Sequence, residues 1–182
     1  MGTVTTLPHG QPLTRDDLDA MPDDGHRYEL VDGTLVVTPA PSFRHQGVVG
    51  ELHLLLRQAC PPDFYVLFAP FDVALTQDTV LQPDLLVARR AAFTARDLPA
   101  APLLVIEVLS PSTRHVDRGL KLARYETAGC PSYWVVDPDE PALTVWELVG
   151  QEYECRARVT GRERYTSSVP YEVSIVPAEL LR

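Results

Sequence analysis

Two acidic side chains interrupt apolar segments of the sequence, where a buried charge would be costly. Glu107 lies inside the run 103–109, "LLVIEVL", which is typical of a strand buried on both faces, and Asp84 is near the start of "PDLLVA". Two nearby carboxylates repel each other unless a cation lies between them. Oxygen ligands without clustered Cys or His favour Mg²⁺, with Mn²⁺ as a substitute, over Zn²⁺. The pair therefore predicts a metal site, whereas a turn residue at 84 and an edge-strand carboxylate at 107 are the alternatives.

The only lysine of the chain, Lys121, follows Glu107 closely, and the other fifteen of its sixteen basic residues are arginines. Lysine can be tuned toward proton transfer near neutral pH and arginine cannot. An extended segment of about 16 Å followed by a helix that returns about 12 Å would bring Lys121 back to the level of Glu107. The competing interpretation is a solvent-side ion pair with Asp117, four residues earlier on the same helix.

Length and composition predict one globular domain at 13–182, preceded by a flexible tail at 1–12. No window is apolar enough for a membrane span, and the N-terminus shows no secretory signal. Three cysteines without a CxxC pair are expected to be reduced, which favours a cytoplasmic protein.

The net charge of −9 excludes a passive nucleic-acid-binding module, since such modules neutralise phosphates with a positive field, but it allows an enzyme that meets phosphate through a metal. Four arginines at 156, 158, 162 and 164 form a local exception. They either protect an edge hairpin against aggregation or form a phosphate-contacting arm.

The predicted elements alternate between helices and strands. Helices are expected at 14–21, 44–59, from Ser112 or Thr113 to Gly129, and at 176–181. Strands are expected at 64–70, 71–75, 83–88, 103–110, 132–138, 143–150 and 152–159, with a hairpin at 27–39 that turns at Asp32-Gly33. This order predicts an α/β or α+β domain with a mixed sheet.

Several of these segments together resemble the Uma-type restriction-endonuclease-like family of the PD-(D/E)XK nuclease superfamily. The resemblance rests on "QPDLLVA", "VIEVLSPST", "RYELVDGTLVVTPAP" and "HVDRGLKLARYETAGCPSYWVVDP", and it spans about 14–150. It implies a helix, three strands, helix, strand core: a central mixed sheet flanked by helices, with an N-terminal β-hairpin and a C-terminal β extension.

The resemblance also implies roles for five residues. Asp84 and Glu107 would bind the metal, and Lys121 would replace the lysine that the superfamily places two residues after the acid, where this chain has Leu109. Glu29 and His45 match recurrent family positions and would complete the metal or water shell. Taken alone, Glu29 could equally be an exposed cross-strand residue and His45 a helix N-terminal residue.

The predicted function is metal-assisted hydrolysis of DNA by an endonuclease that needs Mg²⁺, with activated water as the nucleophile. A homodimer is expected, because cutting both strands favours paired active sites. Ser110 and Ser112 lie where a phosphate oxygen could be bound, although Ser112 could simply cap the helix. The alternative function is a catalytically inactive, nuclease-like regulatory or protein-interaction module, which the acidic composition and the displaced lysine favour.

Overall fold

The computed structural model describes residues 11–22, 24–110 and 116–181, and its largest element is a six-stranded sheet. The strand order is β11-β10-β9-β8-β6-β3. These strands are β3 (Phe64–Phe68), β6 (Leu85–Arg89), β8 (Leu104–Val108), β9 (Ser132–Asp137), β10 (Ala142–Val149) and β11 (Glu152–Thr160). Only β8 and β9 run parallel, and all other pairs in this sheet are antiparallel.

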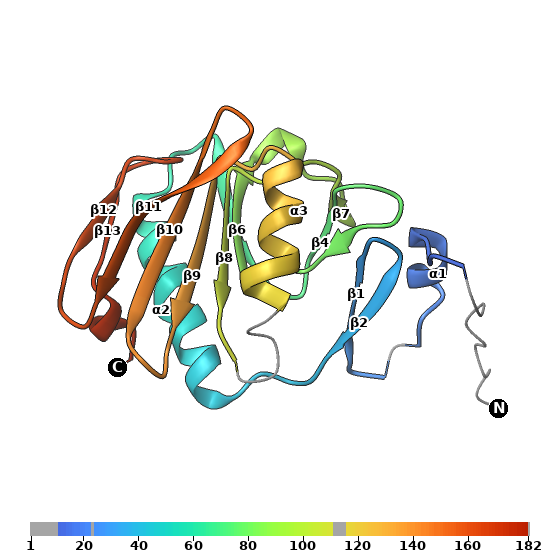
Figure 1. Cartoon of the computed structure of the whole chain (residues 1–182), viewed down its shortest axis with the longest axis horizontal. Coiled ribbons are helices and arrows are strands. Elements are labelled where there is room, and N and C mark those ends of the chain that lie inside the picture. Colours follow the sequence, from blue (N-terminus) through green and yellow to red (C-terminus); the bar gives the residue numbers. More distant parts are fainter. Residues whose placement is uncertain (1–10, 23, 111–115, 182) are drawn as a thin grey trace.

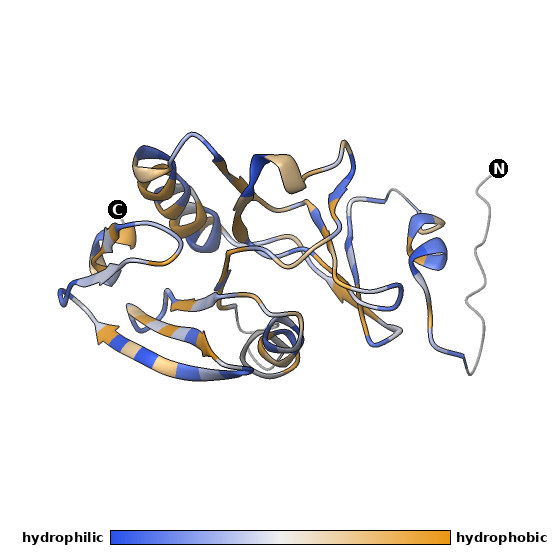
Figure 2. Ribbon diagram, turned by 90° about the horizontal axis from the view of Figure 1, so that it is seen from above, coloured by the Kyte–Doolittle hydropathy of each residue, from blue (hydrophilic) through white to orange (hydrophobic). Residues whose placement is uncertain are grey.

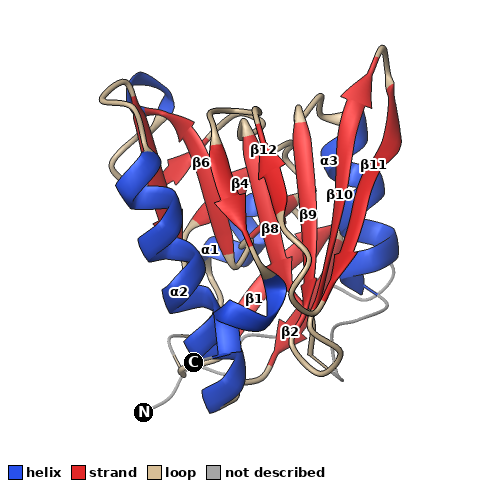
Figure 3. Ribbon diagram, turned by 90° about the vertical axis from the view of Figure 1, so that its left-hand side faces the viewer, coloured by secondary structure: helices blue, strands red, loops and turns tan. Residues whose placement is uncertain are grey.

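Two helical segments lie on opposite faces of this sheet (Figures 1 and 3). Helix α2 (Phe43–Ala59) packs Val48, Leu52 and Leu56 on one face. The parallel β8–β9 pair requires a crossover connection, which is formed by the π-helix η2 (Val116–Lys121) and helix α3 (Leu122–Thr127) on the other face. Together with β3, β6, β8 and β9, these segments form the helix, three strands, helix, strand core, so the predicted fold is confirmed.

Strand β8 divides its side chains between two hydrophobic cores. Leu104, Ile106 and Val108 belong to the core under α2, whereas Val105 belongs to the core under α3. Because side chains alternate along a strand, Glu107 faces the α3 side together with Val105. The alternation of side chains along β8 therefore places the Glu107 carboxylate on the side of the sheet that α3 covers.

A second sheet has the order β2-β1-β5-β4-β7. Its strands are β1 (Arg27–Val31), β2 (Thr34–Thr38), β4 (Asp72–Ala74), β5 (Val80–Leu81) and β7 (Asp97–Leu98). The predicted hairpin at 27–39 is confirmed: Asp32 and Gly33 both have positive φ, 51° and 71°, as a type I′ turn requires. A side chain at Gly33 would also lie 2.4 Å from Cβ of Pro12, so the turn needs glycine for space as well as for conformation.

The remaining elements are short. They are α1 (Arg15–Asp19), the 3₁₀ segments η1 (Arg90–Ala92) and η3 (Pro177–Leu181), and a two-stranded sheet of β12 (Tyr165–Ser167) and β13 (Val173–Ile175). Helix α1 begins after Thr14, whose backbone N–H donates to the Asp17 carboxylate at 2.8 Å. Strands β5, β7, β12 and β13 were not predicted, because two or three residues are too few to show alternation.

Two sequence-based expectations fall outside the described residues, namely most of the 1–12 tail and the Ser112 or Thr113 helix start. The described part of that helix is a π-helix followed by α3. Helix α3 ends at Thr127, shortly before Gly129, whose φ of 79° is incompatible with a right-handed helix. None of the helices in the described ranges is both long and apolar enough to cross a membrane.

Candidate active site

Three carboxylates from different segments of the chain are buried together where the two sheets meet. Glu29 on β1 and Glu107 on β8 are each 1% exposed, and Asp84, which immediately precedes β6, is 3% exposed. The antiparallel register pairs Leu85 with Ile106, so Asp84 lies opposite Glu107. The two acids that the sequence singled out are therefore neighbours. Glu107 lies on an interior strand, so the edge-strand alternative is wrong, whereas Asp84 does occupy a bend after Pro83.

Each oxygen of Asp84 has a separate set of partners. Oδ2 accepts a hydrogen bond from the Val108 backbone N–H at 2.8 Å and lies 3.1 Å from Nε2 of His45. Oδ1 accepts from Nη1 of Arg27 at 3.2 Å. Burial alone would raise the pKa of Asp84, but the His45 hydrogen bond and the charges of His45, Arg27 and Lys121 lower it below its usual value. Asp84 therefore remains a carboxylate despite its burial.

Lys121, the last residue of η2, is inserted between the other two carboxylates. Its Nζ lies 3.1 Å from Oε1 of Glu107 and 3.0 Å from Oε1 of Glu29, and the residue is 2% exposed. Glu29 Oε1 also accepts from the backbone N–H of Gln82 at 2.7 Å. Lys121 thus returns to the level of Glu107 as the chain distances predicted. A solvent-side position for Lys121 is wrong, and the side chain of Asp117 lies outside the described residues.

The fifth charged residue of the cluster, Arg27, was missed from the sequence. It lies two residues before Glu29 on β1, and its Nε is 3.7 Å from Oε2 of that residue. Burial lowers the pKa of Arg27, but the charges of Glu29, Asp84 and Glu107 outweigh burial and raise it overall. In the structure, positions 27, 29 and 31 share one face of the strand, and Val31 is an apolar core residue.

The formal charges of this cluster nearly cancel. Glu29, Asp84 and Glu107 contribute three negative charges, and Arg27 and Lys121 contribute two positive ones. Near-neutrality explains how so many charges stay buried, since an uncompensated one would cost several kcal/mol.

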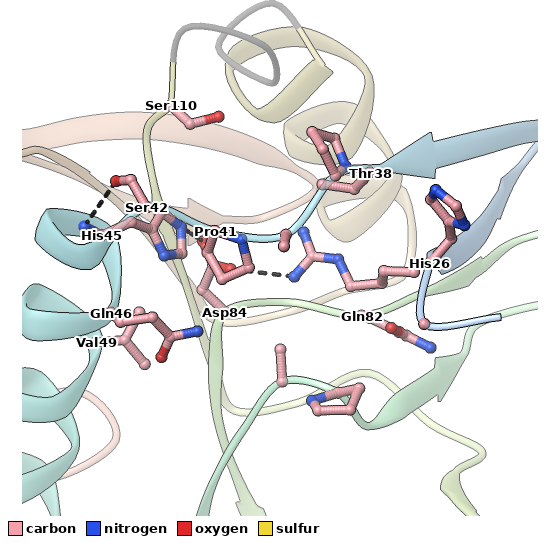
Figure 4. A pocket seen from close by; sticks show the side chains of 16 residues that line it. His26, Thr38, Pro41, Ser42, His45, Gln46, Val49, Gln82, Asp84 and Ser110 are labelled. Carbon is pink, nitrogen blue, oxygen red and sulfur yellow. Dashed lines mark hydrogen bonds and ion pairs between the residues drawn. The ribbon is translucent and has the colours of Figure 1, made fainter. Parts of the chain in front are cut away.

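A pocket of about 520 Å³ opens beside the cluster, between the start of α2, the 39–42 loop and β1. Its polar lining includes His26, Arg27, Gln46, Gln82, Asp84 and Ser110. His45 and Asp84 lie near the start of α2, and His26 and Gln82 lie at the other end of the pocket (Figure 4). Glu29, Glu107 and Lys121 are not among the lining residues, so Asp84 and Arg27 separate them from the pocket.

His45 lies in the first turn of α2, where its backbone N–H donates to Oγ of the N-cap Ser42 at 3.2 Å. Its ring is used as well: Nε2 contacts Asp84, while the buried Nδ1 has no hydrogen-bond partner within the described ranges. His45 is thus a helix N-terminal residue, as one interpretation expected, and its ring also contacts Asp84. Ser110 lines the pocket, and Ser112 lies outside the described residues.

The donor atoms suit a hard cation. Within the described residues no group of three or more His, Cys, Asp or Glu side chains is arranged to hold a metal ion. Mg²⁺, however, usually binds through one or two carboxylates and takes its other ligands from water and substrate phosphate. Asp84 at the pocket wall and Glu107 on the neighbouring strand fit that pattern, provided that Arg27 leaves Asp84.

Comparison with protein families identifies the chain. A family with the description "Uma2: Putative restriction endonuclease" matches residues 15–175. The chain belongs to the Uma2 family. The match extends beyond the segments that carried the resemblance and includes Glu29, Asp84, Glu107 and Lys121, so the family predicted from the sequence is confirmed.

A solved structure supports the Uma2 fold. The chain resembles the crystal structure, at 1.96 Å resolution, of "a putative nuclease belonging to DUF820" from Anabaena variabilis ATCC 29413, with a TM-score of 0.74 and 18% identity. The similarity covers 93% of this chain and 98% of that one. No curated protein matches the chain.

Proposed function

We propose that this Uma2 protein is an endonuclease that requires Mg²⁺ and hydrolyses phosphodiester bonds in DNA. The observation that carries the proposal is the pair of carboxylates, Asp84 opposite Glu107, where Asp84 lines the pocket and Lys121 contacts Glu107. The family description and the nuclease neighbour support the same class of reaction.

Asp84 and Glu107 are the residues that would hold Mg²⁺, or Mn²⁺ in its place. When bound there, the metal would polarise the scissile phosphate and lower the pKa of an attacking water. Two carboxylates leave room in its coordination for substrate oxygens, as this chemistry needs.

Lys121 is proposed to orient Glu107 through the contact of its Nζ with Oε1 at 3.1 Å. A direct contact with the substrate phosphate is not proposed, because Nζ is buried between two carboxylates and does not line the pocket. Glu29 is proposed to hold Lys121 in place, because its Oε1 contacts Nζ on the side opposite Glu107. Both are positioning residues in this proposal.

His45 is proposed to accept a proton from water in the pocket. Asp84 holds Nε2 of the imidazole, so the proton would be accepted at Nδ1, which is buried without a protein hydrogen-bond partner in the described residues. A histidine oriented by a carboxylate is a common general base.

The biological setting completes the proposal. We expect a cytoplasmic protein, in keeping with its unpaired cysteines Cys60, Cys130 and Cys155. We also expect a homodimer, since two active sites would cut both strands of a duplex.

The second candidate is a non-catalytic module with a nuclease fold. Two observations favour it. Arg27 already occupies Oδ1 of Asp84, where a metal ion would bind, and the net charge of −9 repels nucleic acid. Divalent-metal binding separates the two candidates, since a module without chemistry has no need of the ion.

The deciding experiment compares Asp84→Asn with Asp16→Asn, which removes an equal charge from an exposed position on α1. Cleavage of plasmid DNA with Mg²⁺ and calorimetric Mn²⁺ binding are measured on proteins shown to be folded by circular dichroism. Asp84→Asn is expected to lose more than about a hundredfold in cleavage, because even outer partners of metal ligands contribute roughly 10–100-fold. Wild-type cleavage by folded Asp84→Asn would refute the proposal, and absence of metal binding in the wild type would favour the module.

A further inference from the structure

Of the two basic residues in the buried cluster, Arg27 and Lys121, only Arg27 also lines the pocket. Its side chain is 20% exposed, whereas that of Lys121 is 2% exposed and lies behind it. Arg27 contacts Asp84 at 3.2 Å and Glu29 at 3.7 Å. It is therefore positioned to exchange a contact inside the cluster for one in the pocket.

The two oxygens of Asp84 differ in how easily they could change partner. Oδ2 is held by a backbone N–H of the neighbouring strand and by His45, and a backbone group in a sheet cannot move away alone. Oδ1 is held by a long arginine side chain that reaches the pocket. A cation that binds Asp84 would thus compete with Arg27 for Oδ1.

The charge balance points in the same direction. With Arg27 and Lys121 in place, the three carboxylates keep one excess negative charge. A divalent ion would bring the positive charges to four against three, so the cluster would no longer need Arg27 and the ion would repel it. The guanidinium would then be free for an anion in the pocket.

We propose that Arg27 is the phosphate-binding residue of this site: it is paired with Asp84 in the metal-free protein and is released into the pocket when a divalent metal binds. The inference rests on the proposed function. The planar guanidinium can donate two parallel hydrogen bonds to a phosphate, which a lysine ammonium cannot do in the same geometry. Because binding effects are reciprocal, a phosphate that draws Arg27 away from Asp84 also favours the metal.

The test measures Mn²⁺ affinity by calorimetry without substrate, on the wild type, Arg27→Gln and Arg27→Lys. Arg27→Gln is expected to bind Mn²⁺ about tenfold more tightly, since a hydrogen bond to a charged group no longer has to be broken. Arg27→Lys should fall between the two. The matched control is Arg96→Gln, which removes an arginine whose side chain is 70% exposed and paired with Asp19, and it should leave the affinity unchanged.

The same proteins are then saturated with Mn²⁺ and titrated with thymidine 5′-monophosphate. Arg27→Gln is expected to bind the nucleotide about tenfold more weakly than the wild type. Opposite changes in metal and nucleotide affinity are the signature of the proposed exchange, because a purely structural arginine would weaken both.

Equal or weaker Mn²⁺ binding by folded Arg27→Gln would overturn the exchange while leaving the proposed function intact. Failure of the wild type to bind Mn²⁺ at all would overturn both. If Arg27→Gln does not fold, the Nε–H resonance of Arg27 is followed in the wild type during a Mg²⁺ titration and assigned with Arg27→Lys. Movement of that resonance in step with metal binding supports the exchange, and a resonance that stays in place refutes it.

Discussion

Two cations in this molecule each bridge a pair of glutamates, yet they lie in opposite surroundings. Lys121 contacts Glu29 and Glu107 at 3.0 and 3.1 Å with 2% of its side chain exposed. Arg156 on β11 contacts Glu147 and Glu154 at 3.1 and 3.6 Å with 48% exposed. The distances are similar, so burial decides what each arrangement contributes.

The bridge on β11 belongs to an edge strand. Hydrophilic and hydrophobic residues alternate along β11, at the lower left of Figure 2, and most of its residues are exposed. Charges along an edge discourage pairing with another chain, which fits the protective role expected for Arg156 and Arg158. The buried bridge instead fixes the geometry of a site. Three measurements test this contrast.

The largest difference is expected between two cysteines, one from each environment. Cys130 is fully buried, and burial raises its pKa to about 12, so that only about one molecule in ten thousand carries the thiolate at pH 8. Cys155 on β11 is exposed. We expect iodoacetamide at pH 8 to modify Cys155 more than about a thousandfold faster than Cys130 in the folded protein.

Mass spectrometry of tryptic peptides over a time course provides the measurement, and Cys155→Ser controls for reagent that reaches other thiols. Modification of Cys130 at a comparable rate would show that the core under α3 opens readily, and the buried bridge would then be solvated as well.

The next largest difference concerns the two bridges themselves. Lys121→Met leaves Glu29 and Glu107 buried without their shared cation, and we expect a loss of about 3–5 kcal/mol in the free energy of unfolding. Arg156→Met should cost less than about 1 kcal/mol, because water solvates the glutamates that remain. Urea unfolding followed by circular dichroism measures both.

A double variant makes this prediction specific. Glu107→Gln added to Lys121→Met should recover part of the stability, since it removes one of the uncompensated charges. Equal losses in Lys121→Met and Arg156→Met would mean that the cluster is as well hydrated as the surface.

The smallest difference concerns an intermediate ion pair, Arg15 with Asp97, whose side chains are 18% and 10% exposed. The hydrogen bond from Thr94 lowers the pKa of Asp97; burial opposes this, and Arg15 adds to the lowering. A lowered pKa stabilises the fold above the unfolded value of about 3.9, and that stabilisation is lost as the pH falls through the lower folded value. Asp97→Asn is therefore expected to cost about 1–3 kcal/mol at pH 7 and progressively less below pH 4.

Unfolding curves of the wild type and Asp97→Asn from pH 7 to pH 2 test the sign. A gap that widens toward acid pH would contradict it. Asp16→Asn, at an exposed position of α1, controls for the general effect of removing a negative charge.

The sequence predicted the long elements well because each carries its own pattern. The apolar stripe of α2 and the Asp32-Gly33 turn are local signals, and both agree with the structure. The second sheet could not be predicted, since β5 and β7 have two residues each and form only through pairing with distant strands. The expected N-terminal hairpin is therefore part of a five-stranded sheet that the sequence did not indicate.

The site was predictable in part for the same reason. Glu107 and Lys121 stood out because each is unusual in its own segment, and a distance argument then brought them together. Arg27 did not stand out, since arginine is the common base of this chain and its contact with Asp84 joins residues 57 positions apart. Only the meeting of the two sheets shows that it belongs to the cluster.

The order in which the chain is synthesised gives the buried bridge a further meaning. Glu29 leaves the ribosome long before Lys121, which follows it by more than ninety residues. Until then the carboxylate has no lysine to accompany it into an apolar layer, and water is its better environment. We therefore expect the N-terminal hairpin to close over the nascent core only after the crossover between β8 and β9 has emerged.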